Sequence, residues 1–445
     1  MPNPAILVHG YSDIGKSFFN WKAFLEANGY SAVPIHVADY KTLTNEVTIK
    51  DIAEAFDRAL REQGGLDEGK PFDAIVHSTG MLVVRSWLTT YAYRRNRLKR
   101  LIGLAPATWG SPLAHKGRSW LGAIFKGNKD ILDPDFMEAG DRVLDALELG
   151  SRFTWDLAHV DLFGTDTYYG PSADTPWIFT LCGIDTYDGL RSIVNEPGMD
   201  GTVRWAGCSL DSRKIVLDLT RHPGEKGRVW VSEKLAIDAP FVPIGGVNHG
   251  TILDPNKSET LQKLILEALQ VENEVAFMKW RESAARSTAR ERALLESDLG
   301  RWQQFIVHAV DERGDPVPDY HIELVADGNN PLRKTTEFNV DAHVYRVDPS
   351  FRCFHLNLNE LNGIDPVALQ LRVMASAGSH LVSYAGWTTT GSGGTVRAQM
   401  GEWDGILDVG KIPGGVKVFF PFTTTLIELR LNREPRSEVC RIVQP

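Results

Sequence analysis

Apolar positions in the first 255 residues fall into short runs of strand length, separated by stretches with helical spacing. The runs expected to form strands are residues 5–8, 31–36, 72–76, 98–104 and 177–182, and residues 229–236 form a weaker sixth candidate. Strands that alternate with amphipathic helices are typical of βαβ units around a mostly parallel sheet. The pattern therefore predicts an α/β domain over residues 1–255.

Two further regions follow along the chain. Between residues 256 and 300, helical spacing gives way to a charged stretch without Pro or Gly, residues 279–296. We interpret this region as a core helix followed by a solvated helical connector, with a partner-binding coiled coil as the alternative. Over residues 301–445, short alternating runs are separated by Gly, Pro and Asn, with no helical period between them. This last region is expected to form an accessory antiparallel β-sandwich.

The chemistry of the first region centres on residues 76–80, Val-His-Ser-Thr-Gly. They lie between a predicted strand and an apolar stretch, residues 81–88, that has the pattern of a helix. A serine on such a sharp turn has its hydroxyl lifted out of the sheet, and the helix N-terminus points at developing negative charge. Ser78 is therefore the candidate nucleophile, although Val76 stands where the pattern G-x-S-x-G has its first glycine.

A serine hydroxyl becomes a good nucleophile only when a base takes its proton and a third group orients that base. In this arrangement the acid and then the histidine follow the serine along the chain. Asp200, in the turn sequence Gly-Met-Asp-Gly, is the candidate acid, with Asp185 and Asp188 as competitors. His249, in a loop just before the long helical region, is the candidate base.

A tetrahedral intermediate also needs preorganised N–H donors for its negative charge. The amide of Thr79, directly after the nucleophile and at the start of a helix, is one candidate. The other is the amide of Tyr11, because Gly10 allows the chain to turn at the end of the first strand.

These motifs resemble those of lipases in the α/β-hydrolase superfamily, of the bacterial triacylglycerol lipase type. Such lipases have His-Gly plus an apolar residue after the first strand, H-S-x-G at the nucleophile, D-G-x-V around the acid and a late histidine loop. The chain shows these motifs in that order, at residues 9–11, 77–80, 200–203 and 248–250. The segment at residues 105–112 also looks like the one that leads into a lipase lid.

The resemblance covers about residues 1–255 and implies an α/β-hydrolase fold with a lid insertion at about residues 109–170. It implies Ser78, Asp200 and His249 as a catalytic triad, and the amides of Tyr11 and Thr79 as the oxyanion hole. No cofactor is expected. Nothing after about residue 300 resembles the lipase core.

The expected insertion suggests the substrate class. It carries an apolar stripe that includes Trp120 and Phe125, flanked by Lys and Arg. A helix of this kind can lie on a lipid surface or close over an acyl pocket, and a helix packed on its own core is the alternative. With Trp109 at its start, the insertion favours an ester with an apolar acyl chain and transient contact with a membrane surface. His159 and Asp161 lie close together here, but two residues at this spacing favour a loop over a metal site.

Composition narrows the partners and the location. The formal net charge of -9 argues against a general nucleic-acid binder. Four scattered cysteines predict neither a disulfide framework nor a metal site. The sequence contains no apolar run long enough to span a bilayer and no signal-peptide pattern at its start. We therefore expect a cytoplasmic location, with export that needs no signal peptide as the alternative; the sequence names no protein partner for the β-sandwich.

Three hypotheses for function stay open. The first is a serine carboxylic-ester hydrolase, a lipase or esterase that extends to phospholipids. The second is an acyltransferase that uses the same triad, with an acyl acceptor that outcompetes water. The third is a hydrolase-fold binding scaffold without activity, for which Val76 is the supporting feature.

Overall fold

The computed structural model of the 445-residue chain describes residues 2–9, 18–35, 46–62, 65–66, 69–91, 96–114, 141–172, 174–232, 239–294, 299–326, 340–362, 369–389, 395–399, 405–408 and 418–440. The chain divides into two compact units. Unit 1 comprises Met1–Ser212 and Ala236–Leu299, and unit 2 comprises Arg213–Leu235 and Gly300–Pro445. The segment Arg213–Leu235, which interrupts unit 1 along the chain, thus belongs to the same unit as the C-terminal region.

Unit 1 is built on a six-stranded, fully parallel sheet of order β2-β1-β3-β4-β5-β8. Its strands are β1 (Ala5–Val8), β2 (Ala32–Ile35), β3 (Phe72–His77), β4 (Leu98–Leu104), β5 (Trp177–Gly183) and β8 (Phe241–Ile244). Every residue of β1, β3, β5 and β8 is buried, as expected for strands that are covered on both faces. The continuous apolar runs seen in the sequence therefore have a direct structural cause.

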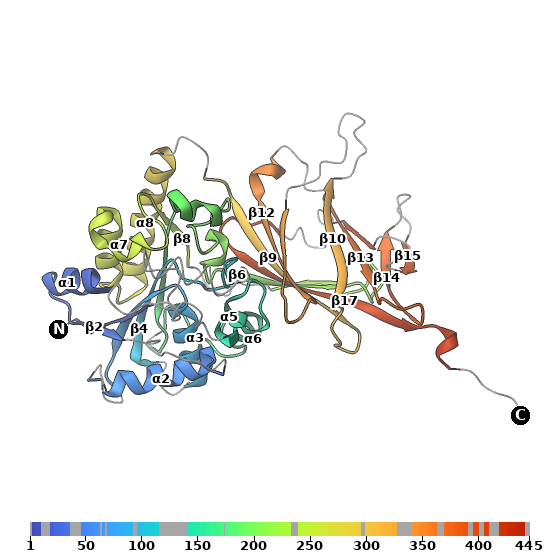
Figure 1. Ribbon diagram of the computed structural model, residues 1–445, viewed down its shortest axis with the longest axis horizontal. Coiled ribbons are helices and arrows are strands. Elements are labelled where there is room, and N and C mark those ends of the chain that lie inside the picture. The colour runs from blue at the N-terminus through green and yellow to red at the C-terminus, as the bar shows by residue number, and fades with distance from the viewer. Residues whose placement is uncertain are drawn as a thin grey trace, which may run out of the picture. The chain divides into compact units, whose positions relative to one another are not determined.

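Helices cover both faces of this sheet. They are α1 (Phe19–Ala27), α2 (Ile49–Glu62), α3 (Gly80–Thr90), α5 (Asp141–Leu147), α6 (Arg152–Asp161), α7 (Glu259–Ala268) and α8 (Glu274–Leu294). Figure 1 shows α2 and α3 on one face and α7 and α8 on the other. The first half of α8 is part of the core, because Trp280 packs edge-on against Phe179 of β5 at 4.6 Å and donates to the Leu264 carbonyl at 3.0 Å.

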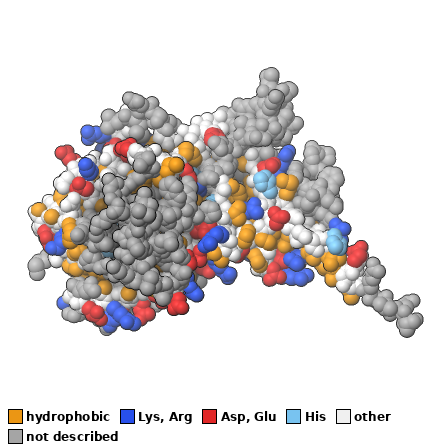
Figure 2. Space-filling model, viewed as in Figure 1, with side chains coloured by type: hydrophobic (Ala, Val, Ile, Leu, Met, Phe, Trp, Pro, Cys, Tyr) orange, Lys and Arg blue, Asp and Glu red, His pale blue; other side chains and the backbone are white. Residues whose placement is uncertain are grey.

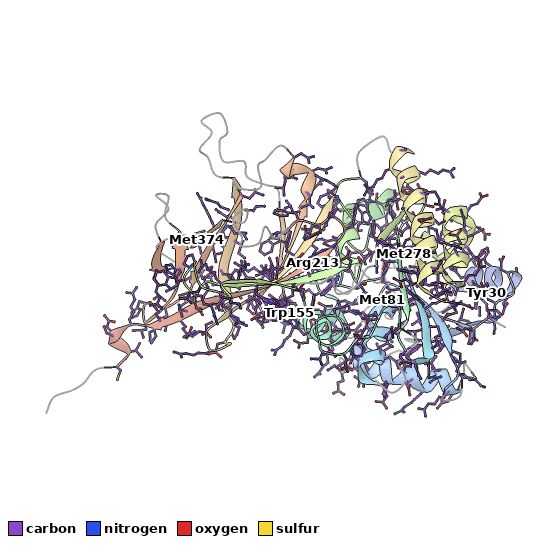
Figure 3. The ribbon with its side chains drawn as sticks, turned by 180° about the vertical axis from the view of Figure 1, so that it is seen from behind. Tyr30, Met81, Trp155, Arg213, Met278 and Met374 are labelled. Carbon is purple, nitrogen blue, oxygen red and sulfur yellow. The ribbon has the colours of Figure 1, made fainter. Side chains whose placement is uncertain are left out.

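The start of α3 approaches β1 closely. A Cβ atom added at Gly80 would lie 2.7 Å from the Val8 carbonyl oxygen, so only glycine fits without a shift of the backbone. Met81, labelled in Figure 3, is fully buried next to it. The Met81 side chain and Pro106 occupy the space beside Gly103 of β4, where an added Cβ would meet them at 2.9 and 2.8 Å. These close contacts fix the turn between β3 and α3.

Unit 2 consists of two sheets with a shared apolar core. The larger has eight strands, with six in the order β11-β12-β9-β17-β14-β15, while β6 joins at β17 and β7 pairs with β6. The smaller has the order β10-β13-β16. The bounds are β6 (Ser212–Asp218), β7 (Val229–Val231), β9 (Trp302–Asp311), β10 (Asp319–Ala326), β11 (Val340–Val344), β12 (Phe351–Asn357), β13 (Leu369–Ser376), β14 (Val382–Thr389), β15 (Thr395–Gln399), β16 (Gly405–Asp408) and β17 (Thr424–Pro435).

The core of unit 2 lies between the faces of these two sheets, which makes the unit a β-sandwich. Buried residues of β6, β9, β14 and β17 pack in one cluster with Tyr320 of β10 and Val373 of β13. The pair of β9 and β17 is parallel, whereas the pairs β10–β13, β11–β12, β12–β9, β13–β16, β14–β15, β14–β17 and β6–β7 are antiparallel. At the edge of this core, the Arg213 guanidinium lies 3.3 Å from the centre of the Phe420 ring, and Figure 3 labels Arg213.

The surface gives two further facts. In the part of the chain that the structure describes, no helix is both long and apolar enough to cross a bilayer. On the face drawn in Figure 2, described Lys and Arg side chains are interspersed with Asp and Glu.

The close approach at Gly80 can be tested by substitution. We expect Gly80→Ala to lower the free energy of unfolding by ~2 kcal/mol, because the added methyl group overpacks against a backbone oxygen. Alanine otherwise stabilises a helix relative to glycine, so a lower free energy of unfolding in Gly80→Ala would be due to the clash. Gly224→Ala is the control, since its Cβ would meet its nearest neighbour at 3.6 Å. Equal denaturant midpoints for both variants and the wild type would rule out the constraint.

Candidate active site

Ser78 has a strained backbone at the end of β3. Its φ is +52°, a left-handed conformation that residues other than glycine adopt rarely. Backbone hydrogen bonds hold it there: the Ser78 N–H donates to the Leu104 carbonyl at 3.3 Å, and the Ser78 carbonyl accepts from Ala107 at 3.0 Å and Met81 at 3.2 Å. This conformation turns the chain sharply from strand to helix, as the sequence motif predicts.

The departure from the glycine pattern at Val76 is accommodated by the sheet. Val76 is fully buried within β3. Its partner in register on β4 is Gly103, which adds no side chain on the face that both residues share. The second glycine of the pattern, Gly80, is present where an added Cβ would lie 2.7 Å from a backbone oxygen of β1. The left-handed turn at Ser78 therefore forms with a β-branched residue two positions earlier.

Asp200 and His249 form a buried pair. The Nδ1 atom of His249 lies 2.8 Å from Oδ2 of Asp200, and both side chains are fully buried. Because the carboxylate can only accept, Nδ1 carries the proton and Nε2 is left as the basic nitrogen. The other carboxylate oxygen, Oδ1, accepts from the amides of Thr202 at 2.9 Å and Val203 at 2.8 Å.

Two loops at one edge of the sheet carry this pair. Asp200 follows β5 and His249 follows β8, and the ends of these parallel strands lie at the carboxyl edge where β3 delivers Ser78. A backbone hydrogen bond joins the two loops directly, from the His249 N–H to the Asp200 carbonyl at 3.1 Å. The competitors Asp185 and Asp188 make no hydrogen bond to His249 within the described residues.

His77 is linked to the same loop. Its Nε2 lies 2.9 Å from the carbonyl oxygen of His249, and the two imidazole rings are 4.6 Å apart. Since the carbonyl only accepts, Nε2 of His77 carries the proton. Burial, with the nearby His249 and His9 side chains, holds the pKa of His77 well below its ordinary value. His77 is therefore a neutral donor that ties the end of β3 to the histidine loop; its place beside the serine was the only sequence signal for this contact.

Of the two residues predicted to supply oxyanion-hole N–H groups, the structure describes Thr79 only. Thr79 is the N-cap of α3, with αR backbone angles, and no acceptor for its amide is found among the described residues. Its N–H lies at the positive end of a helix. Tyr11 lies outside the described residues.

A buried ion pair supports the helix behind Ser78. On α3, Arg85 donates from Nε and Nη2 to the two carboxylate oxygens of Asp161 on α6, at 2.8 and 3.0 Å. Its Nη1 donates to the Thr108 carbonyl at 2.9 Å, and the Tyr169 hydroxyl donates to Asp161 at 2.5 Å. The network joins α3, α6 and the loop after β4. Asp161 is thus engaged with Arg85 and Tyr169, and no cluster of metal-ligating side chains is found in the described ranges.

Of the predicted substrate residues, only Trp109 lies within the described part of the chain. It is fully buried, and its indole N–H donates to the Ser209 carbonyl at 3.0 Å. Trp120 and Phe125 fall in residues 115–140, outside the described ranges. Beyond that gap, α5 and α6 complete the segment predicted to be the lid insertion.

Comparison with solved structures identifies the fold. The chain is similar to phospholipase PlaB from Legionella pneumophila, solved alone and in complex with thio-NAD; each comparison gives 24% identity, a TM-score of 0.77, and coverage of 99% of this chain and 96% of that chain. The mature lipase BlEst2 from Bacillus licheniformis gives a TM-score of 0.39 at 18% identity, with 60% of this chain and 92% of that chain covered. No protein-family profile and no curated protein sequence matches the chain.

The chain therefore has an α/β-hydrolase fold with a parallel six-stranded sheet, joined to a C-terminal β-sandwich. The fold implied by the sequence motifs is confirmed.

The neutral state of His77 predicts a pH dependence of stability. Its pKa is lower in the folded chain than in the unfolded chain, so below about pH 6.5 only the unfolded state takes up the proton. Stability is then lost as pH falls below that value, by up to ~1.4 kcal/mol per pH unit for this one group. His77→Gln keeps an N–H donor but cannot ionise, so we expect it to lose less stability than the wild type between pH 7 and pH 5. Parallel curves for the two proteins would contradict this.

Proposed function

We propose that the chain is a serine carboxylic-ester hydrolase that acts through an acyl-enzyme on Ser78. The observation that carries the proposal is the buried Asp200–His249 pair, set on loops at the same sheet edge as the left-handed turn at Ser78. An unfavourable backbone conformation persists only where its surroundings impose it, and such residues cluster at active sites. Packing alone gives no reason for a serine at this turn.

Each residue has a distinct role in the proposed reaction. His249 Nε2 takes the hydroxyl proton of Ser78 as Oγ forms a bond to the ester carbonyl carbon. Asp200 keeps Nδ1 protonated and stabilises the imidazolium. The Thr79 amide, with that of Tyr11, donates to the oxyanion. The imidazolium then protonates the departing alcohol, and a water molecule, deprotonated by His249, releases the carboxylic acid and regenerates Ser78.

The proposed substrate is an ester with an apolar acyl chain, and phospholipids belong to this class. The apolar stripe around Trp120 and Phe125 is expected to contact the acyl chain or a membrane surface. PlaB, which shares the fold, is a phospholipase, and this supports a lipid substrate for the present chain.

Two alternatives differ in what they require. An acyltransferase would use the same triad but pass the acyl group to an alcohol or amine instead of water. A scaffold without activity was suggested only by Val76, and the turn at Ser78 keeps its left-handed conformation beside that residue. We therefore favour hydrolysis over a pure binding role.

Hydrolysis of p-nitrophenyl esters of graded chain length, with phospholipid vesicles in parallel, tests the proposal. We expect wild-type turnover to increase with acyl length and Ser78→Ala to lower kcat by a factor of about 10⁴ or more. Ser86→Ala, which removes a second buried serine eight residues further on, is the matched control and should retain activity. Turnover that survives in Ser78→Ala would mean that another residue is the nucleophile.

If the wild type turns over none of these esters, an added alcohol or amine acceptor distinguishes transfer from a lack of activity. Product formed only with the acceptor present would replace hydrolysis by acyl transfer.

A further inference from the structure

A pair of thiols lies behind the carboxylate of Asp200. Cys182, in β5, has its Sγ atom 3.5 Å from Oδ2 of Asp200. This is the same oxygen that accepts from His249, so the three groups converge on one atom. Cys208 follows with its Sγ atom 3.5 Å from that of Cys182 and 3.4 Å from the Arg204 carbonyl oxygen. Both cysteines are fully buried.

The direction of these hydrogen bonds follows from the groups involved. An ionised carboxylate has no proton to give, so the thiol of Cys182 must donate to Asp200. Its sulfur lone pairs then face Cys208, which can donate its own proton to Cys182 or to the Arg204 carbonyl. Cys208 thus restricts the rotation of the Cys182 side chain from behind.

Both thiols are in the form that this arrangement needs. Burial raises the pKa of Cys182 and of Cys208, so both stay protonated near neutral pH. A thiolate, and not a thiol, is the species that attacks other sulfur atoms. The two thiols are therefore expected to act as hydrogen-bond donors and not as a reactive redox pair.

We infer that Cys182 is a positioning residue for the catalytic acid, held in orientation by Cys208. The inference rests on the proposed function, because it assigns Asp200 to the triad. The amides of Thr202 and Val203 fix Oδ1, and without Cys182 the histidine would be the one side chain among the described residues that holds Oδ2. The S–H donor limits rotation of the carboxylate and takes up part of the negative charge on Oδ2.

This role predicts a change in pH dependence. When the thiol is removed, the negative charge on Oδ2 is no longer shared with an S–H donor and stabilises an imidazolium at His249 more strongly. For Cys182→Ala we expect the acid limb of kcat/KM to move to higher pH, with kcat lowered about threefold to tenfold, as for loss of one weak hydrogen bond to a charged group. Cys182→Ser restores a donor and should return the profile towards that of the wild type.

Two further variants complete the comparison. Cys208→Ala keeps the Cys182 thiol as a donor but lets its side chain rotate. We therefore expect a smaller shift of the acid limb of kcat/KM, in the same direction as for Cys182→Ala. Cys353→Ala removes another fully buried thiol, in unit 2, and should leave the profile unchanged. Titration with a fluorophosphonate gives the active fraction of each preparation. A structural defect alone would reduce that fraction without moving the acid limb, and this result would overturn the inference.

An infrared measurement tests the contact without turnover. The S–H stretching band of Cys182 is identified as the band missing from Cys182→Ala, and it should move to higher frequency in Asp200→Ala, where its acceptor is gone. If the Cys182 band has the same frequency in the wild type and in Asp200→Ala, the inference is overturned, even if the wild type is an active esterase. A wild type that hydrolyses no ester but shows the shift would refute the proposed function and leave the thiol contact established.

Discussion

The left-handed backbone at Ser78 is the constraint on which the site depends. A φ of +52° is unfavourable for a serine, and it persists because β3 and α3 are held in place around it. Hydrogen bonds from Ala107 and Met81 to the Ser78 carbonyl fix the turn, and the missing side chain at Gly80 lets α3 approach β1. Behind the helix, the buried ion pair of Arg85 prevents α3 from moving away. These contacts together offset the cost of the strained conformation.

The proposed acid and base, Asp200 and His249, are positioned by contacts between loops. Asp200 receives two backbone amides, and the His249 N–H donates to the Asp200 carbonyl. His77 binds the carbonyl of His249 and so connects that loop to the strand that delivers Ser78. A geometry held by several independent hydrogen bonds is preorganised, and the proposed triad would need such preorganisation.

Much of unit 1 could be predicted from local sequence pattern. The strand of Leu98–Leu104 has the expected bounds, and the serine motif lies on a strand-to-helix turn as expected. The last strand of the sheet, Phe241–Ile244, was not predicted, because Pro243 interrupts a very short run. This strand and β2, which contains Pro34, are the two edges of the six-stranded order, where the lost N–H of a proline is tolerated.

The contacts that could not be predicted are those between distant segments. The side chains of Ser212–Asp218 give no sign that the strand pairs with β17, more than two hundred residues later. The parallel pairing of β9 with β17 was not predicted, because apolar and polar residues alternate along a strand in the same way whether its neighbour is parallel or antiparallel. Likewise, the contact of Cys182 with Asp200 could not be predicted, because the sequence shows only that Asp200 follows the strand that contains Cys182. Local pattern specifies elements and motifs, whereas side-chain neighbours depend on the assembled fold.

Labelling with a fluorophosphonate, followed by peptide mapping, tests the central claim most directly, because it depends on an activated serine and on no particular substrate. The account predicts a single adduct on Ser78 in the wild type, much slower labelling in Asp200→Asn and almost none in His249→Ala. An adduct on another serine, or equal labelling rates in all three proteins, would contradict it.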